Sequence, residues 1–307
     1  KNEAKALASL TKAFELDTTD ARVLMELDQL RKRMNQDHGA RLRFLQQYTT
    51  LVETRDDLYL ELITLYNQLG EFEQAKELLA SRKFHPWEGG EGKVVNQYLI
   101  CCIELARKAI QSADYARALS LLEEAAEYPD NLGEGKLPGT AENDIHYLKG
   151  IILQRMGDKV SAQEMFEHAT RGNSEPAQAI FYNDPQPDKI LYQGLAWIEL
   201  GEKNKADDIF TKLIAFGKEH MDDQIAIDYF AVSLPELLVF DIDLNLRNRI
   251  HCHYLIALGE LGLSMSNGKN TEGLFGKVIA LDKNHQGALL HKNLGKQLKV
   301  TLKHSTP

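Results

Sequence analysis

The sequence has few cysteines and no long hydrophobic run. Its 307 residues include only three cysteines, Cys101, Cys102 and Cys252. None has the spacing of a metal-binding Cys-x2-Cys motif, so we expect reduced thiols in the core of a cytoplasmic protein. No apolar run approaches the ~20 residues of a transmembrane helix, and the N-terminal KNEAKALASLTKAFELD lacks the layout of a signal peptide. We therefore expect a soluble protein with no membrane partner.

Positive charge is also scarce. The 36 lysines and arginines are outnumbered by 45 aspartates and glutamates, which gives a net charge of −9. Nucleic-acid binding depends on many basic contacts to phosphates, so we expect no nucleic-acid partner. The sequence GEGK occurs at 90–93 and 133–136, but Val94 and Leu137 stand where a phosphate-binding loop needs a hydroxyl after the lysine. We expect no cofactor.

Catalytic and metal-binding patterns are equally sparse. His251 and His253 lie two residues apart, which places them on different sides of a helix and argues against a zinc site. Glu88 and Glu91 could form a pair of carboxylates for acid–base chemistry, but solvent-exposed side chains are the simpler interpretation. We expect no metal, no catalytic residue and no enzymatic activity in this chain.

The sequence does contain a repeated spacing of small and bulky residues, G-x2-L-x3-G-x4-A-x3-F. Small residues on facing sides of two helices let the backbones approach, while a bulky residue one turn away fills the remaining space. A glycine at the turn ends the first helix. The spacing therefore predicts pairs of helices, and it is kept or nearly kept by Gly150, Leu153, Gly157, Ala162 and Phe166, and by Gly194, Trp197, Gly201, Ala206 and Phe210.

This spacing resembles the signature of the tetratricopeptide repeat family, although the family's tryptophan and closing proline are mostly absent. The resemblance covers nearly all of the chain. It implies an all-α fold, an α-α superhelix: a right-handed solenoid of about six to seven helix hairpins in a single domain, 1–307. A half-repeat is expected at 1–17 and a closing helix at about 286–300. Because the chain begins inside an amphipathic helix, we expect it to be a fragment of a longer protein.

Long loops between the repeats are a second feature. The distance from Ala75 to Ala118 is 43 residues, longer than the family's period of about 34. The extra residues fall at equivalent phases, and equivalent loops of a solenoid line one edge. Loops of this length are often functional. The four predicted loops are 84–95, 129–141, 172–188 and 221–245.

These loops carry the candidate ligand-binding or partner-binding residues. Aromatic rings beside carboxylates and amides suit the stacking and hydrogen bonding of sugars. The simpler alternative is that the polar loops only pack on each other. The candidates are Trp87, Glu88, Glu91, Lys93, Asn131, Glu134, Lys136, Tyr182, Asn183, Asp184, Asp188, Arg247 and His251.

The family resemblance also implies which residues line the concave groove. Most of that surface is apolar here and needs a cover, which could be a partner, another domain or the long loop 221–245. We expect the segment FAVSLPELLVF of that loop to pack into or beside the groove. The expected groove residues are Ile103, Arg107, Tyr147, Ile151, Leu191 and Leu195.

The loops themselves carry a closer resemblance. HPWEGGEGKV, YPDNLGEGKLPG and FYNDPQPD, together with the segment DYFAVSLPELLVFDIDLNLRNRIHCHYL, are similar to the C-terminal repeat region of large bacterial proteins. In those proteins an uncharacterised β-rich domain, related in appearance to sugar-active folds, precedes the repeats. The resemblance implies a non-catalytic protein-interaction scaffold that binds a protein or its own N-terminal β-rich domain. The alternative is a carbohydrate-binding or carbohydrate-active accessory region that uses the loop edge.

Overall fold

A computed structural model of the chain describes residues 2–87, 89–178, 186–226, 243–294 and 297. These residues form α-helices and one short 3-10 helix, and no β-strand occurs among them. The chain divides into two compact units, and the division falls inside helix α7 (Lys93–Gln111). The expected all-α fold class is confirmed.

The first unit contains the N-terminal helices and a short loop from further along the chain. α1 packs on α2, α3 on α5, and α5 on α6. α5 ends at Gly70 in the left-handed conformation, with φ of 83°, as predicted for a glycine that closes the first helix of a hairpin. Its helices are α1 (Glu3–Leu16), α2 (Ala21–Arg33), α3 (His38–Gln46), α4 (Thr49–Val52), α5 (Asp56–Leu69), α6 (Phe72–Ser81), the first half of α7 and η1 (Asp130–Leu132).

A buried ion network joins three helices of the first unit. The side chain of Arg41 is fully buried and pairs with Asp28, which accepts hydrogen bonds at 3.1 and 2.6 Å. The same guanidinium contacts Glu61 at 2.7 Å, and Lys32 reaches the other oxygen of Glu61 at 2.8 Å. Every charge in this network therefore faces at least one opposite charge.

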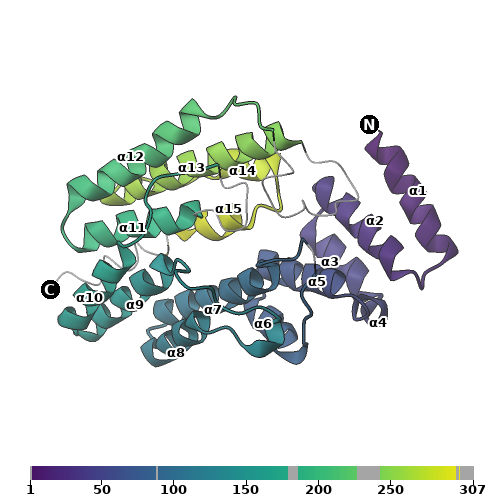
Figure 1. Cartoon of the computed structure of the whole chain (residues 1–307), viewed down its shortest axis with the longest axis horizontal. Helices are drawn as coiled ribbons and strands as arrows, with labels where there is room; N and C mark the ends of the chain where they lie inside the picture. The colour runs from purple at the N-terminus through teal and green to yellow at the C-terminus, as the bar shows by residue number, and fades with distance from the viewer. Residues whose placement is uncertain (1, 88, 179–185, 227–242, 295–296, 298–307) are drawn as a thin grey trace. The chain divides into compact units, whose positions relative to one another are not determined.

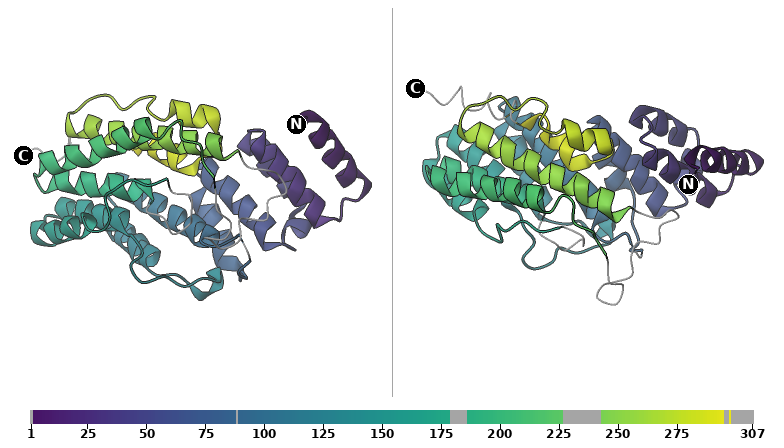
Figure 2. Two further views of the ribbon diagram at one scale, coloured as in Figure 1. Left: turned by 45° about the horizontal axis from the view of Figure 1, so that its top comes forward. Right: turned by 90° about the horizontal axis from the view of Figure 1, so that it is seen from above.

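The second unit consists of successive helix hairpins (Figure 1). α9 packs on α10, α11 on α12 and α12 on α13, and Figure 2 shows these helices side by side from two further directions. The hairpins coincide with those predicted from the repeated spacing. Beyond the second half of α7, the helices are α8 (Tyr115–Ala126), α9 (Asn143–Met156), α10 (Lys159–Ala169), α11 (Pro187–Glu199), α12 (Lys203–Glu219), α13 (Leu244–Ser266), α14 (Gly276–Leu281) and α15 (Gln286–His291).

Aspartates begin several of these helices. A carboxylate at the N-cap accepts a hydrogen bond from a backbone N–H that has no partner within the helix. Asp158, for example, accepts from the N–H of Ser161 at the start of α10. Equivalent N-caps are Asp20, Asp37, Asp114 and Asp243.

The glycine and phenylalanine of the repeated spacing meet across two hairpins, α9–α10 and α11–α12. A Cβ atom at Gly150 would lie 2.5 Å from the ring of Phe166, and one at Gly194 would lie 2.3 Å from the ring of Phe210. A Cβ at Gly262 on α13 would also lie 2.2 Å from the ring of Phe210. These contacts bring α11, α12 and α13 close together and explain why the spacing requires glycine.

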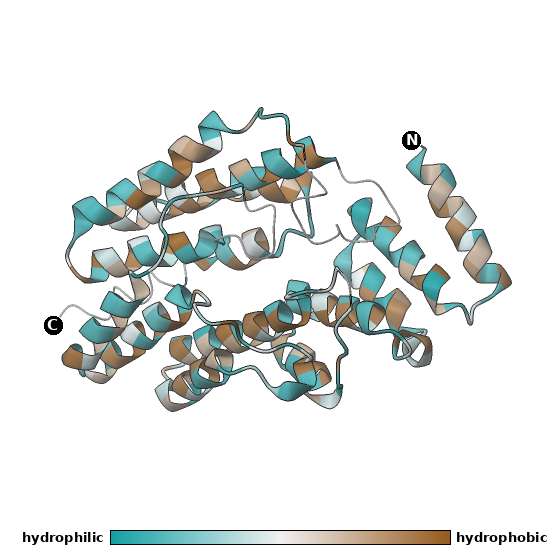
Figure 3. Ribbon diagram, in the orientation of Figure 1, coloured by the Kyte–Doolittle hydropathy of each residue, from teal (hydrophilic) through white to brown (hydrophobic). Residues whose placement is uncertain are grey.

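Figure 3 shows that the helices carry both hydrophobic and hydrophilic residues along their turns. The three cysteines are buried free thiols, as predicted, and burial raises the pKa of Cys101 to about 12.

Within the described ranges, every helix is too short or too polar to cross a membrane.

Candidate functional site

The predicted groove residues belong to one layer of helices in the second unit. α7, α9 and α11 each supply two of the six, and α11 packs on both α9 and α13. All six side chains are buried, although a concave binding surface of an open solenoid would expose them. Something within the unit therefore covers this layer. The six are Ile103, Arg107, Tyr147, Ile151, Leu191 and Leu195.

Arg107 carries the charge at the centre of the layer. Its guanidinium donates hydrogen bonds to the carboxylate of Glu104 and to the hydroxyl of Tyr192, both of which are buried. The Nε atom of Arg107 is buried and has no hydrogen-bond partner among the described residues. Burial raises the pKa of Glu104 and that of Tyr192. The ring of Tyr147 lies 5.6 Å from that of Tyr192 and completes this surface.

Two further acidic residues lie close to Arg107. Asp144 on α9 is buried and pairs with Lys189 on α11, with 2.6 Å between Nζ and Oδ1. Asp188, in the first turn of α11, is half-buried and interacts electrostatically with Arg107. The site therefore combines an apolar floor with more acidic than basic groups.

α15 covers this layer. Figure 1 shows it beside α11, and the ring of His291 lies 6.0 Å from Tyr192 and 6.2 Å from Tyr254 on α13. Nδ1 of His291 donates to the carbonyl of Gly287 at 2.8 Å, whereas Nε2 is buried and has no partner within the described ranges. Burial, followed by the charge of Arg107, lowers the pKa of His291 to about 4.

Residues just after α15 continue the cover. Leu294 is fully buried and, together with Gln297, lines a cavity of about 20 Å³. The rest of the cavity lining comes from α7 and α9, namely Arg107, Ile110, Gln111, Leu148 and Ile151. α15, Leu294 and Gln297 thus lie over a layer for which the sequence predicts a different cover.

The cover predicted from loop 221–245 lies largely outside the described residues, because only 221–226 and 243–245 of that loop are described. The expectation that FAVSLPELLVF packs into or beside the groove therefore stays a prediction. The described cover is α15 and Leu294, which lie within the closing helix predicted at about 286–300.

The two GEGK segments are connected by a hydrogen bond in the first unit. The N–H of Gly92, at the start of α7, lies 3.0 and 2.9 Å from the two carboxylate oxygens of Glu134. Gly133 approaches the first loop so closely that a Cβ there would lie 2.8 Å from the carbonyl oxygen of Phe84. Burial raises the pKa of Glu134. Glycine and glutamate are thus needed where one loop meets the other.

Asn131 fastens the second loop to α6. Its side-chain amide donates to the backbone carbonyls of Leu79 and Arg82, both at 2.8 Å. The backbone carbonyl of Asn131 accepts from the N–H of Phe84 at 2.8 Å. These bonds satisfy backbone groups at the end of α6. Asn131 therefore has a structural role in this conformation.

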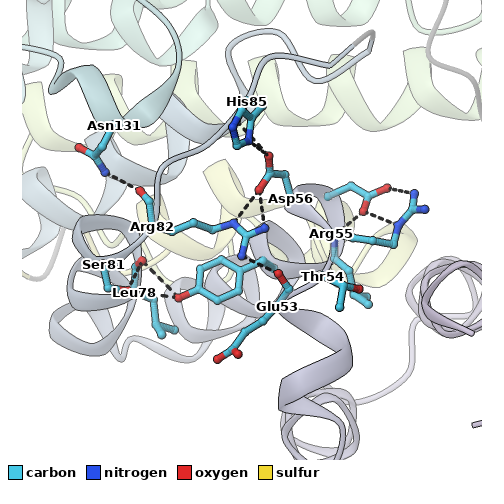
Figure 4. Close-up of polar contacts among 12 residues, drawn as sticks. Glu53, Thr54, Arg55, Asp56, Leu78, Ser81, Arg82, His85 and Asn131 are labelled. Atoms are coloured by element: carbon cyan, nitrogen blue, oxygen red, sulfur yellow. Dashed lines mark hydrogen bonds and ion pairs between the residues drawn. The ribbon is translucent and has the colours of Figure 1, made fainter. Parts of the chain in front are cut away.

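Figure 4 shows the polar contacts around Arg82. Asp56 accepts hydrogen bonds from the Nε of Arg82 at 2.6 Å and from the N–H of His85 at 2.9 Å, while the imidazole of His85 lies 3.2 Å from the same carboxylate. The guanidinium of Arg82 lies over the ring of Tyr59 at 4.5 Å. This cluster holds the beginning of the first loop against α5.

The other loop candidates of the first GEGK segment are less enclosed. Trp87 is half-buried, and its ring lies against Gly90, where a Cβ would be 2.2 Å from the ring. Glu91 and Lys93 are exposed. In the second unit, Lys136 donates to the carbonyl of Ala126 at 2.8 Å and to Glu142 at 2.7 Å, which closes the end of α8.

The later loop candidates are spread along the second unit. His251 is half-buried, with its Nε2 2.8 Å from the carbonyl oxygen of Ala177, and Arg247 is exposed. In the part of the chain that the structure describes, no group of three histidine, cysteine or acidic side chains could hold a metal ion. Glu88, Tyr182, Asn183 and Asp184 lie outside the described residues, and their binding role stays a prediction.

Sequence reasoning missed Tyr192, Tyr254 and His291. Tyr192 is adjacent to the predicted groove residue Leu191, but it lies out of phase with the groove positions. His291 lies in the predicted closing helix. One available signal was charge: the segment that begins at Lys283 is basic and contains no acidic residue. A basic segment in an acidic chain is a candidate for an intramolecular contact.

No family model matches the chain. Among solved structures, the crystal structure of the P58(IPK) TPR domain is similar over 99% of this chain and 89% of that chain, with 14% sequence identity and a TM-score of 0.30. The fold class follows from this chain's own helix hairpins.

Proposed function

We propose that this chain is a non-catalytic protein-interaction scaffold of the tetratricopeptide type, acting in the cytoplasm. Its binding surface is the groove formed by Arg107, Tyr147, Ile151, Leu191 and Tyr192, which we call the seat. The observation that carries this proposal is that a helical segment of the chain itself occupies the seat. A surface that holds one helix has the shape and chemistry to hold another.

The energetics support a helical ligand. Leu294 is fully buried, and complete burial of a leucine side chain stabilises a contact by about 1.5–3 kcal/mol. The Nε of Arg107, which has no partner among the described residues, and the half-buried carboxylate of Asp188 supply polar groups that can orient a ligand. The partner is a protein, either separate or the β-rich domain that the loop resemblance implies.

A carbohydrate site on the loop edge is the alternative function. The polar groups of Asn131, Glu134 and Lys136 are engaged with backbone or side chains of the same chain, and Trp87 lies on Gly90. A sugar would have to displace these contacts. The groove therefore has stronger support than the loop edge as a binding surface.

The proposed function is tested with displayed helical peptides. A library is selected against the full chain, and binders are retested with a photoreactive residue at Gln111, which lines the cavity beside the seat. The control carries the same group at Gln163, an exposed residue of α10. Saturable binding with cross-linking from position 111 alone supports the proposal, whereas absence of any binder, or equal cross-linking from both positions, contradicts it.

The same preparation tests the alternative. The full chain is screened against mono- and oligosaccharides, with Trp87→Ala as the variant and Trp197→Ala, on α11 and outside the predicted loops, as the control. Sugar binding that only Trp87→Ala removes would move the function to the loop edge.

A further inference from the structure

The C-terminal segment has a composition unlike the rest of the chain. Residues 283–307 contain five lysines, three histidines and no aspartate or glutamate, although the whole chain has a net charge of −9. Leu290, Leu294 and Leu298 follow one another at intervals of four residues. On a helix this interval places them on one face, so the sequence of the segment is that of a basic amphipathic helix.

The surface under α15 has the complementary charge. Four acidic groups lie around the seat against three basic ones: Glu104, Asp144, Asp188 and Glu199 against Arg107, Arg155 and Lys189. Glu104 and Asp144 are buried, and charges in such a site interact more strongly than in water. The seat therefore favours an occupant that brings positive charge and an apolar face.

The occupant fits the seat incompletely. Nε of Arg107 and Nε2 of His291 are both buried without a hydrogen-bond partner among the described residues. The cavity beside Leu294 measures about 20 Å³, which is room for one water molecule. Buried polar groups without partners reduce the stability of a contact, so a different helix can satisfy the seat better than α15 does.

We propose that the seat binds a basic amphipathic helix of a partner protein, with leucines at four-residue intervals beside lysines or histidines, in exchange for α15. This inference rests on the proposed function and names the class of its partner. In the free chain α15 holds the seat because its covalent connection gives it a high effective concentration. The apparent affinity for a partner is then the intrinsic affinity reduced by the fraction of chains in which the seat is open.

The test uses the full chain and a labelled synthetic peptide with the sequence of residues 284–304. Binding is followed by fluorescence anisotropy for the wild type and for the double variant His291→Ala, Leu294→Ala, which weakens the resident segment. We expect saturable binding to both, at least about tenfold tighter for the double variant because more of its seats are open. A peptide with Leu290, Leu294 and Leu298 replaced by serine is the negative control.

Charge is tested separately. Asp188→Asn removes one acidic group beside the seat, and Asp208→Asn removes one from an exposed position of α12. We expect the first variant to weaken peptide binding several-fold and to reduce its dependence on salt, and the second to leave both unchanged. Equal effects of the two variants would overturn the assignment of the peptide to the seat.

If the double variant fails to fold, hydrogen exchange in the wild type tests whether the peptide displaces α15. Saturating peptide should speed the hydrogen exchange of the α15 amides and leave that of the α5 amides unchanged. No change in α15 would overturn the displacement of α15 by the peptide.

If helices of other chemistry bind from the library and this peptide does not, the inference fails while the proposed function stands. If neither binds, both fail. Dimerisation of the chain through swapped α15 would assign the seat to a second copy and overturn a separate partner.

Discussion

Each unit of this molecule buries one arginine, and the two arginines differ in how completely they are paired. Arg41 in the first unit contacts both oxygens of Asp28 and one of Glu61. Arg107 in the second unit contacts Glu104 and the neutral hydroxyl of Tyr192, and its Nε has no partner among the described residues. The first arginine therefore completes a closed network, and the second retains a donor beside a cavity.

The comparison separates a structural role from a binding role. A buried charge with all its donors engaged has nothing to offer a ligand, whereas an unused donor in an apolar groove can orient one. The polar loop residues Asn131 and Glu134 resemble Arg41 in this respect, because their polar groups bond to other parts of the same chain.

The largest effect is expected from breaking the closed network. Arg41→Ala leaves Asp28 buried without its main partner, and removal of one member of a buried ion pair costs about 3–5 kcal/mol. Urea unfolding should show this loss in the free energy of unfolding. The control, Arg22→Ala, removes an arginine with a 75% exposed side chain paired to Glu26, and should cost about 1 kcal/mol or less. Equal losses would refute the closed-network interpretation.

A smaller loss is expected from disturbing the helices that position the seat. Gly194→Ala places a methyl group 2.3 Å from the ring of Phe210, and overpacking of this kind costs about 1–3 kcal/mol. Gly135→Ala is the matched control, since a Cβ there would meet nothing within 4 Å. Thermal unfolding of both variants checks the difference, which should vanish if α11 and α12 do not approach as described.

Arg107→Met tests the second half of the comparison directly. Burial has already raised the pKa of Glu104, so this carboxyl can take up a proton once its partner is removed. We expect the free energy of unfolding to fall by about 1–2 kcal/mol, clearly less than for Arg41→Ala. A loss as large as that of Arg41→Ala would show that Arg107 is as structural as its counterpart.

The smallest predicted effect is a dependence of the free energy of unfolding on pH, which differs between the two units. The pKa of His291 is about 4 in the folded chain and about 6.5 when unfolded, so the unfolded state binds the extra proton between these values. Its contribution is complete above pH 6.5 and is lost as the pH falls towards 4, by about 1 kcal/mol between pH 7 and pH 5.5. The charged groups that act on His291 are Arg107, Asp144 and Asp188, and the titratable rings of Tyr192 and Tyr254 also face it, with the Tyr254 hydroxyl 3.2 Å from Nδ1. His291→Gln should remove this part of the slope, measured by urea unfolding.

The first unit loses stability only in stronger acid. Burial opposes ionisation of Glu61, but Lys32 and Arg41 lower its pKa to about 2. Its contribution is present above its unfolded pKa of about 4.3 and is lost as the pH falls towards 2. Hydrogen exchange at pH 5.5 should therefore show faster exchange in α15 than at neutral pH after correction for intrinsic rates, with α5 protected at both values.

Much of the fold follows from local spacing. Gly150 with Phe166 and Gly194 with Phe210 stand sixteen residues apart in the chain, and each pair meets within one hairpin. The distance is set by two helices and a tight turn, which periodicity reveals. The six predicted groove residues lie on α7, α9 and α11, because a position within a helix determines the face to which it belongs. Their role in binding stays a prediction.

The amino-acid sequence by itself determined the helix pairs and the buried free thiols, because each depends on neighbours within about one hairpin. Only the tertiary structure decided that α15 covers the groove and that Glu134 meets Gly92. Those contacts join segments far apart in the chain, and a periodic pattern shows which face of a helix is apolar without showing what will bury it.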